Sequence, residues 1–203
     1  AEIVDAHQML GALASDGGDE DQAARHFRRA LELDPDHQAS LFGLARAYRR
    51  LGRTDEALFG FRRLLDVNPE DRKASLAVAE IHVAAGRLDD ALAVLDGIVA
   101  RPGAPAIFRN LRGEVLVLAG RTEEAIVELE QAIEADDRLA LARFDLAVLL
   151  EERGELERAA VLYEAAIERA PSHHRALFNL GRLAGRRGDP GRQQELYEAS
   201  IAA

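Results

Sequence analysis

The chain of 203 residues contains no cysteine and no tryptophan, and aromatic residues make up only 5% of it. The absence of cysteine excludes disulfide bonds, thiolate metal sites and thiol nucleophiles, while it leaves the redox compartment open. With so few aromatic side chains, a core must be built from leucine, alanine, isoleucine and valine. The longest apolar runs, VLVLAG and LAVLL, are far too short to span a membrane as a helix.

Positive charge is also scarce, because 26 lysines and arginines face 36 aspartates and glutamates, for a formal net charge of −10. This balance argues against nucleic acid or an anionic membrane as the partner. The chain begins AEIVDAH, without methionine and without the pattern of a signal peptide. We therefore expect a piece of a longer protein, and the sequence does not predict its compartment.

Glycine, in contrast, recurs with a strict and unbroken period. Six glycines are evenly spaced along the chain: Gly18, Gly52, Gly86, Gly120, Gly154 and Gly188. Seven positions before them stand small residues: Gly11, Ala45, Ala79, Gly113, Ala147 and Gly181. Five positions after them stand Ala23, Ala57, Ala91, Ala125, Ala159 and, in the last copy, Gln193. Nine positions after them stand Phe27, Phe61, Leu95, Leu129, Tyr163 and Tyr197.

This joint pattern resembles the tetratricopeptide repeat (TPR) family, whose unit is a helix-turn-helix with the same period. The resemblance covers essentially the whole chain and implies an all-α fold, a right-handed α-solenoid of six stacked units. The units would span residues 4–37, 38–71, 72–105, 106–139, 140–173 and an incomplete 174–203, forming one domain over 1–203.

Local chemistry agrees with such hairpins. A glycine can end the first helix in the left-handed conformation, which lets the chain reverse. Acids then crowd the start of the second helix, as in TDEA and TEEA, where they complement the helix dipole. We expect Thr54 and Thr122 to be N-caps, and Asp189 to cap a helix whose first residue is Pro190. One hairpin cannot bury its apolar face alone, so neighbouring units must stack.

Some residues depart from the pattern. Arg112 stands where the other units have leucine or valine, so either Leu111 takes its place or the helix is shifted by one residue. The segment RPGAP predicts a bend at 101–105 between units three and four. Gln193, at a tight contact, would cost about 1–3 kcal/mol in a rigid site. At the end of the chain we expect four residues to be partly uncovered: Leu177, Leu180, Leu183 and Ile201.

The sequence offers no catalytic chemistry. It lacks the HExxH, GxSxG, P-loop and Rossmann motifs. The paired histidines at 173–174 and the adjacent carboxylates, such as Glu123 and Glu124, are better explained as solvated turns and helix starts. Adjacent carboxylates on a helix point in different directions, whereas acid–base catalysis needs them to converge. We predict no catalytic residue, no metal site and no cofactor, and hence no enzyme.

The resemblance does imply a binding groove, because family members line their concave surface with residues of each first helix. The positions carried over are Phe42, Arg46, Arg49, Arg50, Lys73, Leu76, Asn110, Phe144, Arg175, Phe178, Asn179, Arg182 and Arg186. Equivalent positions in the middle units hold Glu80, Val83, Glu114, Val117, Val148 and Glu151. Two cationic groups thus flank a more neutral and acidic middle. The segment ARAYRR also fits a solvated helix end, where the helix dipole favours arginine. Its arginines can therefore be interpreted as groove lining or as helix-end charges, and both interpretations stay open.

Three functions follow from these observations. The first is a scaffold for protein–protein interaction that binds an extended or helical peptide segment with acidic and apolar residues. Asp145 stands where a polar or basic residue would be needed to clamp a chaperone tail, so that partner is not predicted. The second is an accessory domain of a larger enzyme, such as a glycosyl-transfer or hydrolytic protein. The third is self-assembly, a homo-oligomer formed through the uncovered C-terminal unit.

Overall fold

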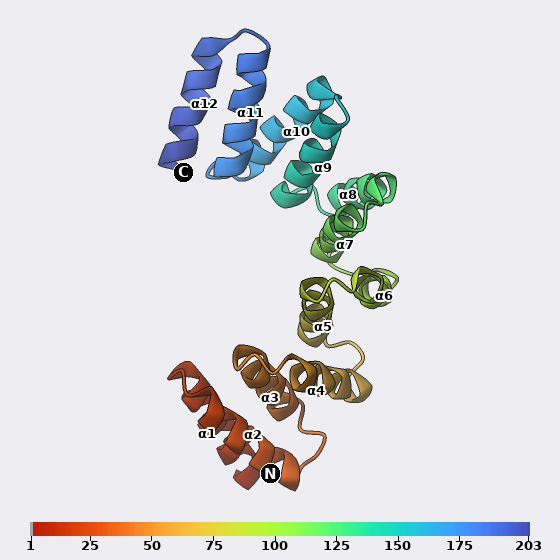
Figure 1. Cartoon of the computed structure of the whole chain (residues 1–203), viewed down its shortest axis with the longest axis vertical. Helices are drawn as coiled ribbons and strands as arrows, with labels where there is room; N and C mark the ends of the chain where they lie inside the picture. The colour runs from red at the N-terminus through yellow and green to blue at the C-terminus, as the bar shows by residue number, and fades with distance from the viewer. Residues whose placement is uncertain (1) are drawn as a thin grey trace. The chain divides into compact units, whose positions relative to one another are not determined.

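The computed structural model describes residues 2–203, which form twelve α-helices and no strand (Figure 1). The first six are α1 (Glu2–Asp16), α2 (Glu20–Leu33), α3 (Gln38–Arg50), α4 (Thr54–Val67), α5 (Arg72–Ala84) and α6 (Leu88–Val99). The others are α7 (Ala106–Leu118), α8 (Thr122–Ala135), α9 (Ala140–Glu152), α10 (Leu156–Arg169), α11 (His174–Arg186) and α12 (Pro190–Ala202). The predicted all-α helical repeat is confirmed.

The chain divides into two compact units, Ala1–Ile98 and Val99–Ala203. Within each unit, helices pack as hairpins, for example α3 on α4 and α9 on α10. The second helix of one hairpin then packs on the first helix of the next, as α4 does on α5 and α10 on α11. A single right-handed solenoid over all six hairpins, bent at 101–105, stays a prediction.

The glycine turns adopt the conformation that the sequence predicts. At Gly154 the backbone φ is +82°, in the left-handed region that favours glycine. The Gly154 N–H donates to the carbonyl of Glu151 at 2.9 Å, and the Glu155 N–H donates to that of Leu150 at 2.8 Å. These two bonds form a Schellman motif, which satisfies the last carbonyls of α9 while the chain reverses.

Helix starts agree with the sequence only in part. Asp189 caps α12 by accepting from the Arg192 N–H, and Pro190 is the first helical residue, as predicted. The prediction for Thr54 and Thr122 is wrong, because each is the first residue of its helix and the preceding residue, an arginine, occupies the N-cap position. At α4, Arg53 instead pairs with Glu56 in the first turn at 2.6 Å.

Small residues in the first helix make room for a large residue in the second. A Cβ built on Gly181 would lie 2.9 Å from the ring of Tyr197, so only glycine allows this approach. Gln193 is accommodated in a similar way, next to a glycine. Its side chain lies against Gly185, where a Cβ would approach it to 2.6 Å, and it donates to the Tyr197 hydroxyl at 3.3 Å.

Arg112 is accommodated by a charged partner. The helix α7 keeps the repeat register with α5 and α9, so the shift by one residue does not occur. The Arg112 guanidinium lies 2.8 Å from Glu128, a carboxylate that is mostly buried and that Arg109 also contacts at 3.2 Å. Glu128 stands where the other second helices carry no acid, so an ion pair replaces an apolar contact between α7 and α8.

The expectation for the end of the chain is wrong for three of its four residues. Leu177, Leu180 and Leu183 are buried, and only Ile201 is exposed, at 87%. The second helix of the last hairpin and the preceding α10 cover the leucines, since both pack against α11. Self-assembly through this unit therefore loses most of the apolar surface on which the hypothesis depended.

We predict opposite effects of alanine at two glycines. Gly154→Ala places a Cβ at positive φ and should destabilise the protein by about 1 kcal/mol. Gly97→Ala lies in the exposed interior of α6, where no atom lies within 4 Å of the new Cβ, and should stabilise it by about 0.5–1 kcal/mol. Urea unfolding followed by circular dichroism measures both changes. Equal effects would contradict the assigned backbone conformations.

We also predict strong coupling between Arg112 and Glu128. Glu128→Leu should cost about 3 kcal/mol, because it removes the carboxylate that two guanidinium groups share. Adding Arg112→Leu should recover most of this loss, because it gives this hairpin the same two leucines that the next hairpin has at the equivalent positions, Leu146 and Leu162. The four proteins of this double-mutant cycle are compared by urea unfolding. Additive losses would show that the two side chains do not interact.

Candidate functional site

Three first helices of the second unit, α7, α9 and α11, surround a pocket with a volume of ≈ 250 Å³. The pocket is lined by Glu114, Val117, Leu118, Leu129, Phe144, Asp145, Val148, Leu149 and Arg175. Five of these are groove positions implied by the repeat pattern: Glu114, Val117, Phe144, Val148 and Arg175. The structure thus brings together residues from three successive hairpins of the chain.

A carboxyl pair forms the polar part of this pocket, which we call the α7/α9 pocket. The Nδ2 atom of Asn110 donates to Glu114 Oε1 at 2.6 Å and to Asp145 Oδ2 at 3.0 Å. Asn110 is fully buried, and its Oδ1 atom accepts no hydrogen bond from residues 2–203. One amide therefore holds two carboxyl groups from different helices close together.

The surroundings of the two carboxyl groups favour their protonated form. Burial, followed by the neighbouring Asp145, raises the pKa of Glu114 to about 7. Burial likewise raises the pKa of Asp145, against the opposing effect of its hydrogen bond from Asn110. Arg175 lowers the pKa of both groups, but less than burial raises them. Near neutrality a proton shared by the pair reduces the repulsion between the two groups.

Phe144 contributes a buried aromatic ring to the lining of the pocket. It is 1% exposed, and its ring lies 4.7 Å from the ring of His173. The guanidinium of Arg175 stands over the Phe144 ring, 4.6 Å from its centroid. Two residues that the resemblance places on the groove, Asn110 and Phe144, are therefore buried, and of the two only Phe144 lines the pocket.

A second cluster lies further along the same face, around Glu151 of α9. This carboxylate is 8% exposed and contacts Arg182 at 2.8 Å and Arg186 at 3.3 Å, both from α11. The Tyr163 hydroxyl donates to it at 3.1 Å, and Asn179 donates in turn to that hydroxyl at 3.1 Å. Because two guanidinium groups share one carboxylate, the cluster carries a surplus of one positive charge. Phe178, 49% exposed, stacks on Tyr197 beside it.

The predicted groove arginines of the first unit are also held by carboxylates. Arg49 pairs with Glu80 at 2.7 Å, and Arg50 pairs with Glu20 at 2.6 Å. Phe42 is half-buried and packs edge-on against Phe61, with centroids 5.6 Å apart. The remaining predicted positions are Arg46 and Leu76, which are half-buried, and Lys73, which is exposed. This unit therefore presents less free positive charge than its sequence indicates.

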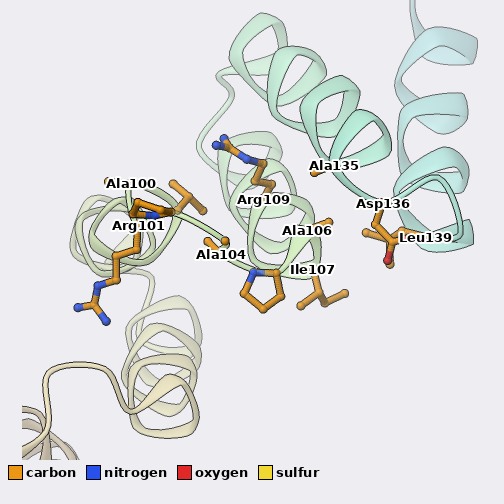
Figure 2. Close-up of a pocket in the computed structure, with 13 residues that line it drawn as sticks. Ala100, Arg101, Ala104, Ala106, Ile107, Arg109, Ala135, Asp136 and Leu139 are labelled. Atoms are coloured by element: carbon orange, nitrogen blue, oxygen red, sulfur yellow. The ribbon is translucent and has the colours of Figure 1, made fainter.

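A larger pocket in the second unit is a weaker candidate. It has a volume of ≈ 810 Å³ and is formed by the segment 99–107 with residues from α7, α8 and the 136–139 turn. Figure 2 shows that Arg101 and Arg109 extend in different directions from its wall. Arg109 is also engaged by Glu128 and by Gln131, the latter at 2.8 Å. The lining is otherwise mainly small and apolar, and its polar groups do not converge.

Comparison with known proteins now decides the family. A sequence model described as "Tetratricopeptide repeat" matches residues 14–59, 52–113 and 116–177. The chain belongs to the tetratricopeptide repeat family. No curated protein matches its sequence. Among residues 2–203 of this repeat protein, no helix is both long and apolar enough to cross a membrane, and no three potential metal ligands converge.

Solved structures share the repeat fold at low sequence identity. A tetratricopeptide repeat protein from Parabacteroides merdae matches with a TM-score of 0.79 and 18% identity, over 100% of this chain and 80% of that one. PilW, a type IV pilus biogenesis factor, matches with a TM-score of 0.73 and 20% identity, over 97% of this chain and 91% of that one. YrrB, described as having an unusual peptide-binding site, matches with a TM-score of 0.63 and 20% identity, over 88% of this chain and 92% of that one. At these identities the likeness shows the fold alone.

Sequence reasoning missed the carboxyl pair, although the repeat contains its signal. Asn110 and Phe144 occupy the same position in neighbouring TPR units, on α7 and α9, which contact each other. Glu114 follows Asn110 by one helical turn, and Asp145 follows Phe144 directly. Reading positions across adjacent repeats, as well as along one helix, would have placed both carboxyl groups beside Asn110.

The raised pKa of Glu114 predicts a specific pH dependence of stability. The folded protein holds a proton that the unfolded chain releases, so stability from this group is present at pH 5 and is lost as pH rises through about 7. Glu114→Gln mimics the protonated form and should raise the melting temperature relative to the original protein at pH 8 but not at pH 5. Thermal unfolding over this range measures the difference.

A matched control is Glu164→Gln, which removes an exposed carboxylate on α10. We expect its difference in melting temperature from the original protein to be the same at pH 5 and pH 8. If Glu114→Gln behaved like this control, the carboxyl pair would not be protonated in the folded protein.

Proposed function

We propose that this tetratricopeptide repeat protein is a non-catalytic scaffold that binds an extended or helical peptide segment along the first helices of its hairpins. The observation that carries the proposal is the α7/α9 pocket, where apolar side chains surround a few polar groups that converge on one point. Such a combination is typical of recognition sites. The fold is compatible with this role, since YrrB has a peptide-binding site on the same architecture.

The charge around the site supports a partner with acidic and apolar residues. Arg182 and Arg186 share one carboxylate, which leaves one positive charge to attract an acid of the partner. The exposed ring of Phe178 offers flat apolar area next to them. An accessory role in a larger enzyme stays an alternative prediction.

The proposal predicts that filling the pocket abolishes binding. Peptides are selected from a phage-displayed library of short random sequences against the full chain, and their affinities are measured by fluorescence anisotropy. Val148→Arg places a long side chain in the pocket, where its charge can pair with the carboxyl groups, and should weaken binding by more than about ten-fold. We expect this variant to stay folded, which circular dichroism checks.

The matched control is Val127→Arg, the same substitution at an exposed valine of the second helix α8. It should change affinity less than about two-fold, because an exposed substitution away from the site alters no contact. Failure to select any binding peptide, or equal loss of affinity in both variants, would contradict the assigned site.

A further inference from the structure

We infer that the α7/α9 pocket binds a basic side chain, a lysine or an arginine, carried by the partner segment. The charged end would lie between Glu114 and Asp145, and the aliphatic part would contact the apolar walls. This inference rests on the proposed function and adds a requirement that the repeat pattern does not imply. The acidic residues of the same segment would then face the Glu151 cluster, where the positive surplus lies.

Charge balance is the first argument. When both carboxyl groups are ionised, the pocket carries two negative charges, and Arg175 supplies one positive charge. One further cation brings the site to neutrality, whereas an additional anion would leave it more strongly charged. In the absence of a ligand a proton takes this role, as the raised pKa of Glu114 indicates. A basic side chain can replace that proton.

Asn110 supplies an independent second argument. Its side chain is completely buried and directed at the carboxyl pair, to which it donates both of its described hydrogen bonds. The Oδ1 atom has no partner among residues 2–203, which is costly for a buried acceptor. An ammonium or guanidinium group brings several donors, so it can pair with both Glu114 and Asp145, which line the pocket, while Asn110 holds the two carboxyl groups together from behind.

The shape of the lining selects a side chain with an apolar stem. Val117 is 37% exposed, Val148 is half-buried and Phe144 is buried, and all three line the pocket. Lysine and arginine bury their methylene groups against such surfaces while the charged end reaches polar partners. A free metal ion or a small ammonium ion would leave these walls uncovered.

The exchange of a proton for a cation makes binding depend on pH. The charged groups that face the pair are Asp145 and Glu114 themselves, Arg175 from α11 and His173 at the start of that helix, while α8 contributes only the apolar Leu129. Burial lowers the pKa of His173, which favours its neutral form. Affinity for a basic peptide should therefore rise between pH 6 and pH 8, as the pair gives up its proton.

A double-mutant cycle tests the inference with the selected peptides as probes. Each basic residue of a peptide is replaced in turn by norleucine, which keeps the aliphatic stem and removes the charge. One replacement should weaken binding to the original protein by about ten-fold or more. Against the Glu114→Gln, Asp145→Asn variant, the same replacement should change affinity less than about two-fold, and the rise with pH should disappear. The control variant Glu164→Gln, Glu168→Gln removes two exposed carboxylates of α10 and should retain both effects.

The outcomes separate this inference from the proposed function. Peptides that bind, lose affinity with Val148→Arg and yet tolerate every norleucine replacement would overturn the basic side chain while supporting the scaffold. Equal norleucine effects in the original protein, the pocket variant and the α10 variant would also overturn it, since they would indicate long-range attraction to an acidic protein. The norleucine series on the original protein needs no variant, so the test stands even if a substitution disturbs folding.

Discussion

The close approach of two helices within each hairpin is the constraint on which the rest of this structure depends. A small residue on the first helix receives a large residue from the second, as Gly181 receives Tyr197, and a glycine with positive φ then returns the chain. This contact fixes the rotation of every first helix about its axis. It therefore determines which side chains are buried in the hairpin and which reach the face that carries the α7/α9 pocket.

The departures from the repeat are informative because they occur in compensating sets. Arg112 is matched by Glu128, and Gln193 is matched by Gly185, each on the partner helix of the same hairpin. Such pairs preserve the hairpin contact with different chemistry. Asn110, Glu114 and Asp145 are a third set, but they join neighbouring hairpins and leave a shared proton and an unpaired acceptor. Of the three sets, this one alone is incompletely satisfied by residues 2–203.

The helices could be predicted from the sequence because their signals are local and repeated. A glycine at the same place in every unit, with small and large residues at fixed offsets, specifies both where helices end and how they pair. The helix caps were less predictable. Residue propensities do not decide whether Arg53 or its neighbour Thr54 occupies the N-cap position of α4. The site was the least predictable. Whether Asn110 is buried, or whether Arg182 is engaged by Glu151, depends on contacts between neighbouring hairpins that no single helix encodes.

The same contacts change which charges of the first helices are available to a ligand. The arginines look like the dominant recognition groups in the sequence, yet Arg49, Arg50, Arg182 and Arg186 each contact a carboxylate of the protein. At Arg49 and Arg50 a partner acid would compete with existing one-to-one ion pairs, whereas the Glu151 cluster keeps its surplus of one positive charge. The carboxyl pair differs because its nearest charges repel, and its ionisation is suppressed by burial and not compensated by a bonded cation. Arg175 offsets the effect of burial only in part, so under the proposed function a ligand cation would compete at the pair mainly with a proton.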